Sequence, residues 1–111
     1  MKKINEDLYV GAQIYASEVK ELSNLGVKSI ICNRPDNESD NQPNFSEIDE
    51  EAKKLSIKTD YIPYYARQMS EEDVKKFAYA LQKLPKPIYA YCLGGVRSEL
   101  IASAAYKILD E

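Results

Sequence analysis

The residues with the clearest chemical potential form the segment Cys92-Leu93-Gly94-Gly95-Val96-Arg97-Ser98, which follows the apolar run of residues 88–91. Glycines let the backbone turn sharply, so that successive N–H groups can point at one anion. The N-terminus of a following helix adds partial positive charge at the same place. A cysteine in this setting is favoured as the thiolate, which is the nucleophilic form. The segment therefore predicts a cysteine nucleophile within an anion-binding loop.

Arg97 and Ser98 extend this prediction. Arginine carries a planar, permanently charged fork that suits an oxyanion, and in the first turn of a helix it opposes the dipole unless an anion offsets it. We therefore expect Arg97 to bind an anion beside Cys92. Ser98 has two open interpretations, as the N-cap of the helix or as a hydrogen-bond donor to the Cys92 sulfur. The expected anion-binding loop comprises Leu93, Gly94, Gly95, Val96, Arg97 and Ser98.

Three further residues are candidates for the same pocket. Arg34 follows a predicted strand, so it can either help to hold the anion or form a salt bridge with Asp36 or Glu38. Tyr64 and Arg67 lie in a loop after another predicted strand and are possible pocket residues.

Composition excludes several other kinds of site. The chain has no histidine, which excludes Ser-His-Asp and Cys-His catalysis and imidazole metal ligands. Glycine-rich nucleotide-binding motifs are also absent, so we expect neither a metal nor an organic cofactor. The net charge is −3, and residues 36–51 contain seven acidic and no basic side chains, which argues against nucleic-acid binding.

Length and cysteine content indicate one domain, residues 1–111, without a transmembrane segment or membrane partner. Two cysteines do not make a disulfide scaffold, and we therefore expect a reducing, cytoplasmic location. Cys32 ends a predicted strand, where packing in the core is favoured over a role as a resolving thiol.

Strands and helices alternate along the sequence. Residues 4–10 predict one or two short strands, and residues 27–32, 57–63 and 88–91 predict three more. Helices are predicted over 18–25 after an N-cap at Ser17, from a capping box at Asn44, from a cap at Ser70, and from about Ser98. This alternation is typical of an α/β fold, a three-layer αβα arrangement around a mainly parallel sheet of four or five strands. Ligands in such sheets bind beyond the carboxyl ends of the strands, where Cys92 lies.

The whole chain resembles the beta-lactamase-hydrolase-like, phosphatase-like family, some of whose members are labelled sulfur transferases. The resemblance rests on residues 4–14, 30–36, 61–63 and 91–98. It implies a protein-tyrosine-phosphatase-like fold. Family members also occur fused to metallo-hydrolase or sulfide-oxidising modules, which implies a sulfide-oxidising module, fused or associated, as a partner.

Three departures from the family pattern bear on the reaction. Tyrosine phosphatases place five residues between cysteine and arginine and rhodanese-type sulfurtransferases commonly four, and this chain has four between Cys92 and Arg97. The loop of residues 64–69 contains no carboxylate to serve as the general acid of a phosphatase. Leu93 and Tyr91 stand where the family often has a basic residue and a histidine, which leaves Arg97 as the only formal cation of the loop.

These departures favour a cysteine-dependent sulfurtransferase as the leading hypothesis. Cys92 would take sulfur from a sulfane donor such as thiosulfate or glutathione persulfide, carry it as a persulfide, and pass it to a thiol acceptor. One alternative is a tyrosine-phosphatase-like phosphatase that uses the same Cys92 and Arg97. A second alternative is a non-catalytic module that binds an anion or a partner protein.

Overall fold

In the computed structural model, which describes residues 1–110, a five-stranded sheet is covered by helices on both faces. The strands are β1 (Lys2–Asn5), β2 (Leu8–Gly11), β3 (Ser29–Cys32), β4 (Lys58–Tyr61) and β5 (Ile88–Tyr91). The helices are a short 3₁₀ turn, η1 (Ala16–Glu18), followed by α1 (Val19–Asn24), α2 (Phe45–Lys54), α3 (Glu71–Lys83) and α4 (Val96–Leu109).

The sheet has the strand order β1-β2-β5-β3-β4. Strands β2, β5, β3 and β4 are parallel, and β1 pairs with β2 in the antiparallel direction at one edge. The last residues of the four parallel strands lie in one row, as Gly11, Tyr91, Cys32 and Tyr61. The chain therefore leaves all four strands at the same edge of the sheet.

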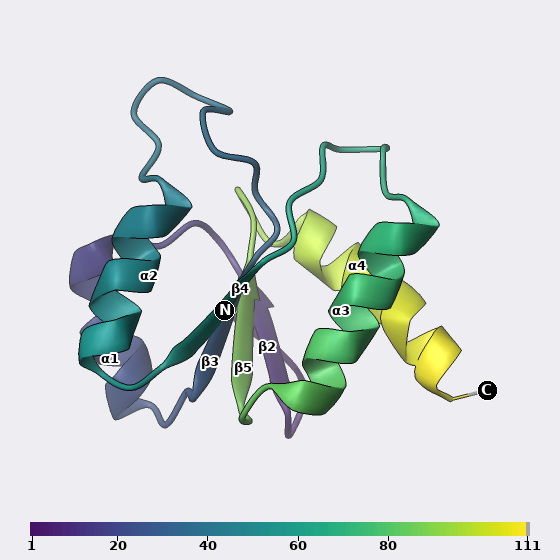
Figure 1. Cartoon of the computed structure of the whole chain (residues 1–111), viewed down its shortest axis with the longest axis horizontal. Helices are drawn as coiled ribbons and strands as arrows, with labels where there is room; N and C mark the ends of the chain where they lie inside the picture. The colour runs from purple at the N-terminus through teal and green to yellow at the C-terminus, as the bar shows by residue number, and fades with distance from the viewer. Residues whose placement is uncertain (111) are drawn as a thin grey trace.

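Helices α1 and α2 cover one face of the sheet, and α3 and α4 cover the other (Figure 1). The core beneath α3 and α4 includes Phe77 and Ile101, and the core beneath α1 and α2 includes Ile30 and Ile48, all fully buried. Burying such side chains contributes about 1.5–3 kcal/mol each. The arrangement confirms the predicted αβα architecture with a mainly parallel sheet.

Local sequence explains where two of the helices begin. The Ser70 side chain accepts a hydrogen bond from the Asp73 N–H at 3.1 Å, and Asp73 in turn accepts from the Ser70 N–H. This is a reciprocal capping box at the point where the sequence predicted a cap. The predicted box at Asn44 and Glu47 also forms. Ser17 is different, because it lies inside η1 while Tyr15 precedes the turn, so the predicted N-cap at Ser17 is wrong.

Other predicted boundaries need small corrections. Strands β3 and β4 are shorter than predicted, at 29–32 and 58–61, because the flanking residues lie outside the ladder. Helix α4 begins at Val96 rather than near Ser98, and Gly95 is its N-cap, which removes the interpretation of Ser98 as the cap. Within the described residues, no helix is both long and apolar enough to cross a membrane.

Candidate active site

The candidate site lies just beyond the row in which the parallel strands end. Gln13 follows β2 by two residues, Cys92 follows β5 directly, and Asn33 and Arg34 follow β3. Tyr64 comes three residues after β4. Side chains from four separate chain segments therefore meet at one edge, as expected for a ligand site in a parallel sheet.

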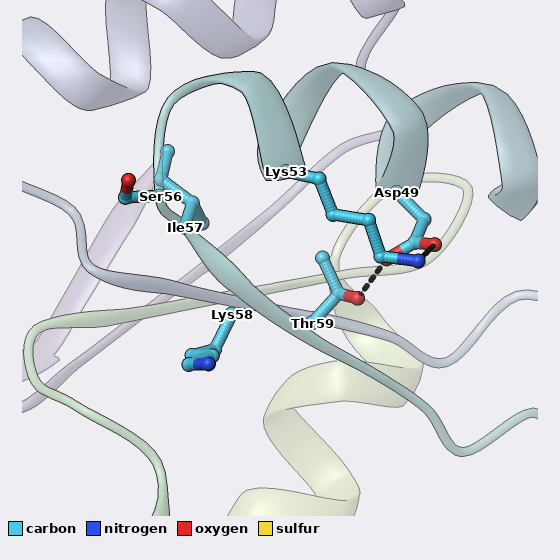
Figure 2. A pocket seen from close by; sticks show the side chains of 6 residues that line it. All are labelled: Asp49, Lys53, Ser56, Ile57, Lys58 and Thr59. Carbon is cyan, nitrogen blue, oxygen red and sulfur yellow. Dashed lines mark hydrogen bonds and ion pairs between the residues drawn. The ribbon is translucent and has the colours of Figure 1, made fainter.

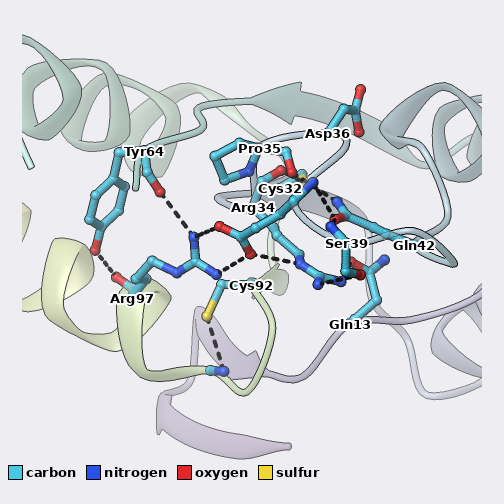
Figure 3. Close-up of polar contacts among 12 residues, drawn as sticks. Gln13, Cys32, Arg34, Pro35, Asp36, Ser39, Gln42, Tyr64, Cys92 and Arg97 are labelled. Carbon is cyan, nitrogen blue, oxygen red and sulfur yellow. Dashed lines mark hydrogen bonds and ion pairs between the residues drawn. The ribbon is translucent and has the colours of Figure 1, made fainter. Parts of the chain in front are cut away.

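Cys92 is 2% exposed and lies at the centre of this group (Figure 3). Its Sγ accepts a hydrogen bond from the Gly95 N–H at 3.0 Å. Burial alone would raise the pKa of the Cys92 thiol, but the backbone N–H groups of Ser98, Gly95 and Arg97 together outweigh burial, so that the pKa is lowered from its ordinary value. The turn before α4 thus favours the thiolate form of Cys92.

Gly95 is required for this turn, whereas the neighbouring Gly94 is not. Gly95 has a φ of 105°, which favours glycine, and a Cβ there would lie 3.2 Å from Gly11 Cα. A Cβ on Gly94 would meet no atom within 4 Å. The close approach of Gly95 to β2 brings its N–H beneath the Cys92 sulfur.

Backbone hydrogen bonds fix the start of the cysteine loop, which we define as residues 92–98. The Cys92 N–H donates to the Gly11 carbonyl at 3.3 Å, and the Gln13 N–H donates to the Leu93 carbonyl at 3.1 Å. The loop is therefore joined to the segment that follows β2 before any ligand binds.

Arg97 lies with its guanidinium against a carboxylate. Its Nη1 and Nη2 donate to the two carboxylate oxygens of Glu38 at 2.7 and 2.8 Å, and Nη1 also donates to the Tyr64 carbonyl at 3.1 Å. Of the five guanidinium N–H groups, the Nε–H and one Nη2–H remain, and these two lie along the same edge. The pKa of Arg97 is raised, mainly by Glu38 and also by the Cys92 thiolate. The remaining edge can therefore bind an oxyanion that approaches the Cys92 sulfur.

Arg34 forms a salt bridge, which is one of the two alternatives that the sequence left open. Its Nε donates to Glu38 at 2.9 Å, and its other donors contact Gln13 and Ser39. The residue is 4% exposed. Its contacts in this structure are thus internal rather than with the pocket.

Ser98 and Asn33 form a fully buried pair behind the Cys92 sulfur. The Asn33 Nδ2 donates to the Ile62 carbonyl at 2.9 Å, which directs Oδ1 toward Ser98. The Ser98 hydroxyl donates to that Oδ1 at 2.8 Å. Because a hydroxyl has one proton and Ser98 donates it to Asn33, we assign most of the stabilisation of the Cys92 thiolate to the backbone N–H groups, which lower the pKa more than the Ser98 side chain does.

Tyr64 and Arg67 lie on the α4 side of the site. The Tyr64 hydroxyl donates to the Arg97 carbonyl, and burial raises the pKa of Tyr64 to about 12. Arg67 is exposed, with a φ of 66°, and lines an apolar groove with Tyr64, Val96, Arg97 and Leu100. Both predicted pocket residues are therefore close to Arg97, Tyr64 as a buried support and Arg67 at the surface.

A different pocket lies between α2 and β4 (Figure 2). There Asp49 pairs with Lys53 at 2.9 Å and accepts a hydrogen bond from the Thr59 hydroxyl. Asp49, Lys53 and Thr59 thus pair with one another in this pocket, which contains no cysteine.

Sequence reasoning missed three residues of the site. Gln13, Asn33 and Glu38 all contact residues of the cysteine loop or their partners. Glu38 had a partial signal, because it lies four residues after Arg34 and was one of its two proposed salt-bridge partners. Its contact with Arg97 spans 59 positions and has no local signature.

Comparison with known proteins gives the family. The profile of the beta-lactamase hydrolase-like protein, phosphatase-like domain, matches residues 1–107. The chain belongs to this family. A beta-lactamase hydrolase-like protein of Agrobacterium fabrum is 31% identical over 96 residues, which cover 86% of this chain and 22% of the relative. The chain thus spans about a quarter of the length of the curated relatives it matches.

Solved structures agree with this assignment. A candidate phosphatase of Neisseria meningitidis Z2491 is 32% identical, with a TM-score of 0.85 over 91% of this chain and 72% of that protein. TpbA of P. aeruginosa, solved in complex with phosphotyrosine, is 19% identical, with a TM-score of 0.67 over 91% of this chain and 58% of TpbA. The fold is therefore protein-tyrosine-phosphatase-like, as the resemblance implied.

The relatives favour one of the sequence hypotheses over another. They support a phosphatase-like domain and give no support to the sulfurtransferase that the loop length suggested. The four-residue spacing was a weaker guide than the overall similarity, because a shorter loop still directs three backbone N–H groups at the sulfur.

Proposed function

We propose that this domain is a cysteine-dependent phosphatase that hydrolyses phosphate monoesters, with Cys92 as the nucleophile. The observation that carries the proposal is the Cys92 sulfur, which accepts a hydrogen bond from the Gly95 N–H and lies beside the edge of Arg97 that does not contact Glu38. The lowered pKa of Cys92 agrees with this geometry. Such donors stabilise the charge that develops on the phosphoryl oxygens during transfer.

The proposed reaction has two steps. The Cys92 thiolate attacks phosphorus, a P–S bond forms, and the P–O ester bond breaks with release of the alcohol or phenol as its anion, which takes a proton from water. Water then attacks phosphorus, the P–S bond breaks, and inorganic phosphate and the thiolate are released, with one proton passing to solvent. In both steps Arg97 binds two phosphoryl oxygens through its Nε and Nη2.

The absence of an acid in residues 64–69 restricts the substrates. Glu38 does not fill this role, because its carboxylate accepts from Arg97 and Arg34 and its pKa is lowered, chiefly by the hydrogen bond to Arg97. We therefore expect substrates whose leaving groups depart as anions, such as aryl phosphates. Phosphotyrosine, the ligand of the TpbA structure, belongs to this class.

A series of aryl phosphates with different phenol pKa values tests the proposal. We expect turnover to rise steeply as the phenol becomes more acidic, and to disappear in Cys92→Ser but not in Cys32→Ala. Neutralising Asp60, Glu71, Glu72 or Asp73 one at a time is expected to leave turnover of the most acidic phenol intact. A native protein without aryl-phosphate turnover would overturn the proposal, and a 10²–10⁴-fold loss in one carboxylate variant would identify a general acid.

Sulfur transfer remains a second candidate. It is favoured by the four residues between Cys92 and Arg97 and by the lack of a carboxylate in residues 64–69. A thiolate leaving group needs no proton, so this reaction does not require a general acid. It predicts that native protein mixed with glutathione persulfide gains one sulfur atom on Cys92. Intact mass under non-reducing conditions measures this, and Cys92→Ser is the control. Unchanged mass together with brisk phosphate turnover would eliminate this candidate.

A further inference from the structure

A buried arginine whose guanidinium contacts other protein side chains links the two ends of the cysteine loop. Arg34 is 4% exposed, and its guanidinium contacts Gln13 on one side and Glu38 on the other (Figure 3). A buried charge is costly unless it is fully paired, so an arginine at this position requires an explanation.

The first link leads from Arg34 to the beginning of the loop. Its Nη1 donates to Gln13 Oε1 at 3.1 Å, while Gln13 Nε2 donates to the Ile14 carbonyl and thereby fixes the orientation of the amide. The backbone N–H of the same Gln13 holds the Leu93 carbonyl. Leu93 directly follows Cys92.

The second link leads from Arg34 to the end of the loop. Its Nε and the Nη2 of Arg97 both donate to the same oxygen of Glu38, Oε1, at 2.9 and 2.8 Å. The other oxygen, Oε2, accepts from Arg97 Nη1 at 2.7 Å. Glu38 is therefore fixed between two guanidinium groups, and its position determines the plane of Arg97.

The segment that carries Glu38 is itself ordered by side-chain bonds. Gln42 Oε1 accepts from the backbone N–H groups of Glu38 and Ser39, and Gln42 Nε2 donates to the Pro35 carbonyl. Arg34 Nη2 adds a contact to the Ser39 hydroxyl at 3.3 Å. Arg34 thus connects an ordered loop to the site.

We propose that Arg34 is a positioning residue that sets the orientation of Arg97 through Glu38 and holds Leu93 through Gln13, and so preorganises the loop for a tetrahedral oxyanion. The inference rests on the proposed function, since it takes Arg97 as the ligand of the phosphoryl oxygens. Lysine at position 34 would keep the charge but lose the rigid fork that reaches both partners.

Tungstate, a tetrahedral oxyanion that requires no turnover, is a suitable probe, with binding measured by calorimetry. We expect Arg34→Lys to weaken tungstate binding about tenfold, the effect of losing one charge-assisted hydrogen bond. Arg97→Lys is expected to weaken it more, and the double variant is expected to lose clearly less affinity than the two single losses combined, because only the link through Gln13 and Leu93 is independent of Arg97. Such non-additivity is the sign that Arg34 acts through Arg97.

Controls separate positioning from general stability. Lys53→Met breaks the distant ion pair with Asp49 (Figure 2) and is expected to leave tungstate affinity unchanged. The thermal midpoint of each variant reports its folding. Gln13→Met removes the side-chain amide, with its bonds to Arg34 and to the Ile14 carbonyl, but keeps the backbone N–H that holds Leu93. It is expected to weaken binding in the same direction, and it provides the test if Arg34→Lys does not fold.

The inference is wrong if a folded Arg34→Lys or Gln13→Met variant binds tungstate as tightly as the native protein, or if the Arg34→Lys loss persists in full in the Arg97→Lys background. Native protein that fails to bind tungstate would also overturn it. Native protein that binds tungstate normally but hydrolyses no aryl phosphate would instead contradict the proposed function and leave the role of Arg34 intact.

Discussion

The two cysteines occupy similar places and have opposite properties. Each is 2% exposed, and they lie at the ends of the neighbouring parallel strands β3 and β5. Burial raises the pKa of Cys32 to about 11, whereas three backbone N–H groups lower the pKa of Cys92 despite its burial.

The difference comes from the backbone around each sulfur. The Cys32 thiol donates to the Arg34 carbonyl at 3.3 Å, and Asp36 adds negative charge that opposes ionisation. The Cys92 sulfur instead accepts from the turn that begins α4. The exposed fraction of the side chain therefore does not distinguish the two thiols, whereas the N–H groups directed at the sulfur of Cys92 do.

The strongest test of this comparison is selective alkylation at pH 7. A thiol with a pKa of about 11 is ionised in about one molecule in ten thousand at that pH. We expect iodoacetamide to label Cys92 at least about 100-fold faster than Cys32, as followed by peptide mass spectrometry. Cys32→Ala should leave the labelling of Cys92 unchanged. Similar rates at the two positions would contradict the thiolate at Cys92.

Substitutions of Gly95 and Gly94 test the source of the pKa difference between Cys92 and Cys32. Gly95→Ala places a Cβ 3.2 Å from Gly11 Cα at a left-handed φ, so it should displace an N–H from the sulfur and raise the pKa of Cys92. We expect alkylation of Cys92 at pH 7 to slow by about tenfold and stability to fall by about 1–3 kcal/mol.

Gly94→Ala is the matched control, because its Cβ would meet no atom within 4 Å. The pH dependence of alkylation and the thermal midpoint should stay close to those of the native protein. Equal effects of the two substitutions would mean that the Gly95 N–H has no special role.

The smallest expected effect concerns the Ser98 hydroxyl. Because its proton is donated to Asn33, Ser98→Ala should change the alkylation rate of Cys92 less than about threefold. Stability should fall by about 1–3 kcal/mol, since the buried Oδ1 of Asn33 loses its donor. The pH profile of alkylation measures the effect on Cys92, and denaturant unfolding measures the change in stability. A marked rise in the pKa of Cys92 would show that the hydroxyl serves the sulfur instead.

Local patterns were sufficient to predict much of the fold and the centre of the site. The capping boxes at Asn44 and Ser70, the apolar run before Cys92 and the glycines after it act over a few residues, so their consequences are visible in the sequence. The loop also has a local signature, which is why Cys92 and Arg97 could be identified as partners.

Contacts between distant segments were not predictable in this way. The position of β5 between β2 and β3 depends on how all strands pack together, and no single segment encodes it. Glu38 and Gln13 reach the cysteine loop only after the sheet has aligned the ends of β2, β3 and β5. Their roles therefore emerge from topology rather than from spacing along the chain.

The strand order also has a consequence for biosynthesis. Strands β1 and β2 pair with each other, as do β3 and β4, but β5, the last strand in the chain, is the strand that joins these two halves. During translation the two halves of the sheet cannot be joined until residues 88–91 have been synthesised. Helix α3 likewise lacks part of its packing surface until α4 has been synthesised. Cys92 directly follows that joining strand. Completion of the sheet and assembly of the site are thus one event, which occurs only after residues 88–98 have been made.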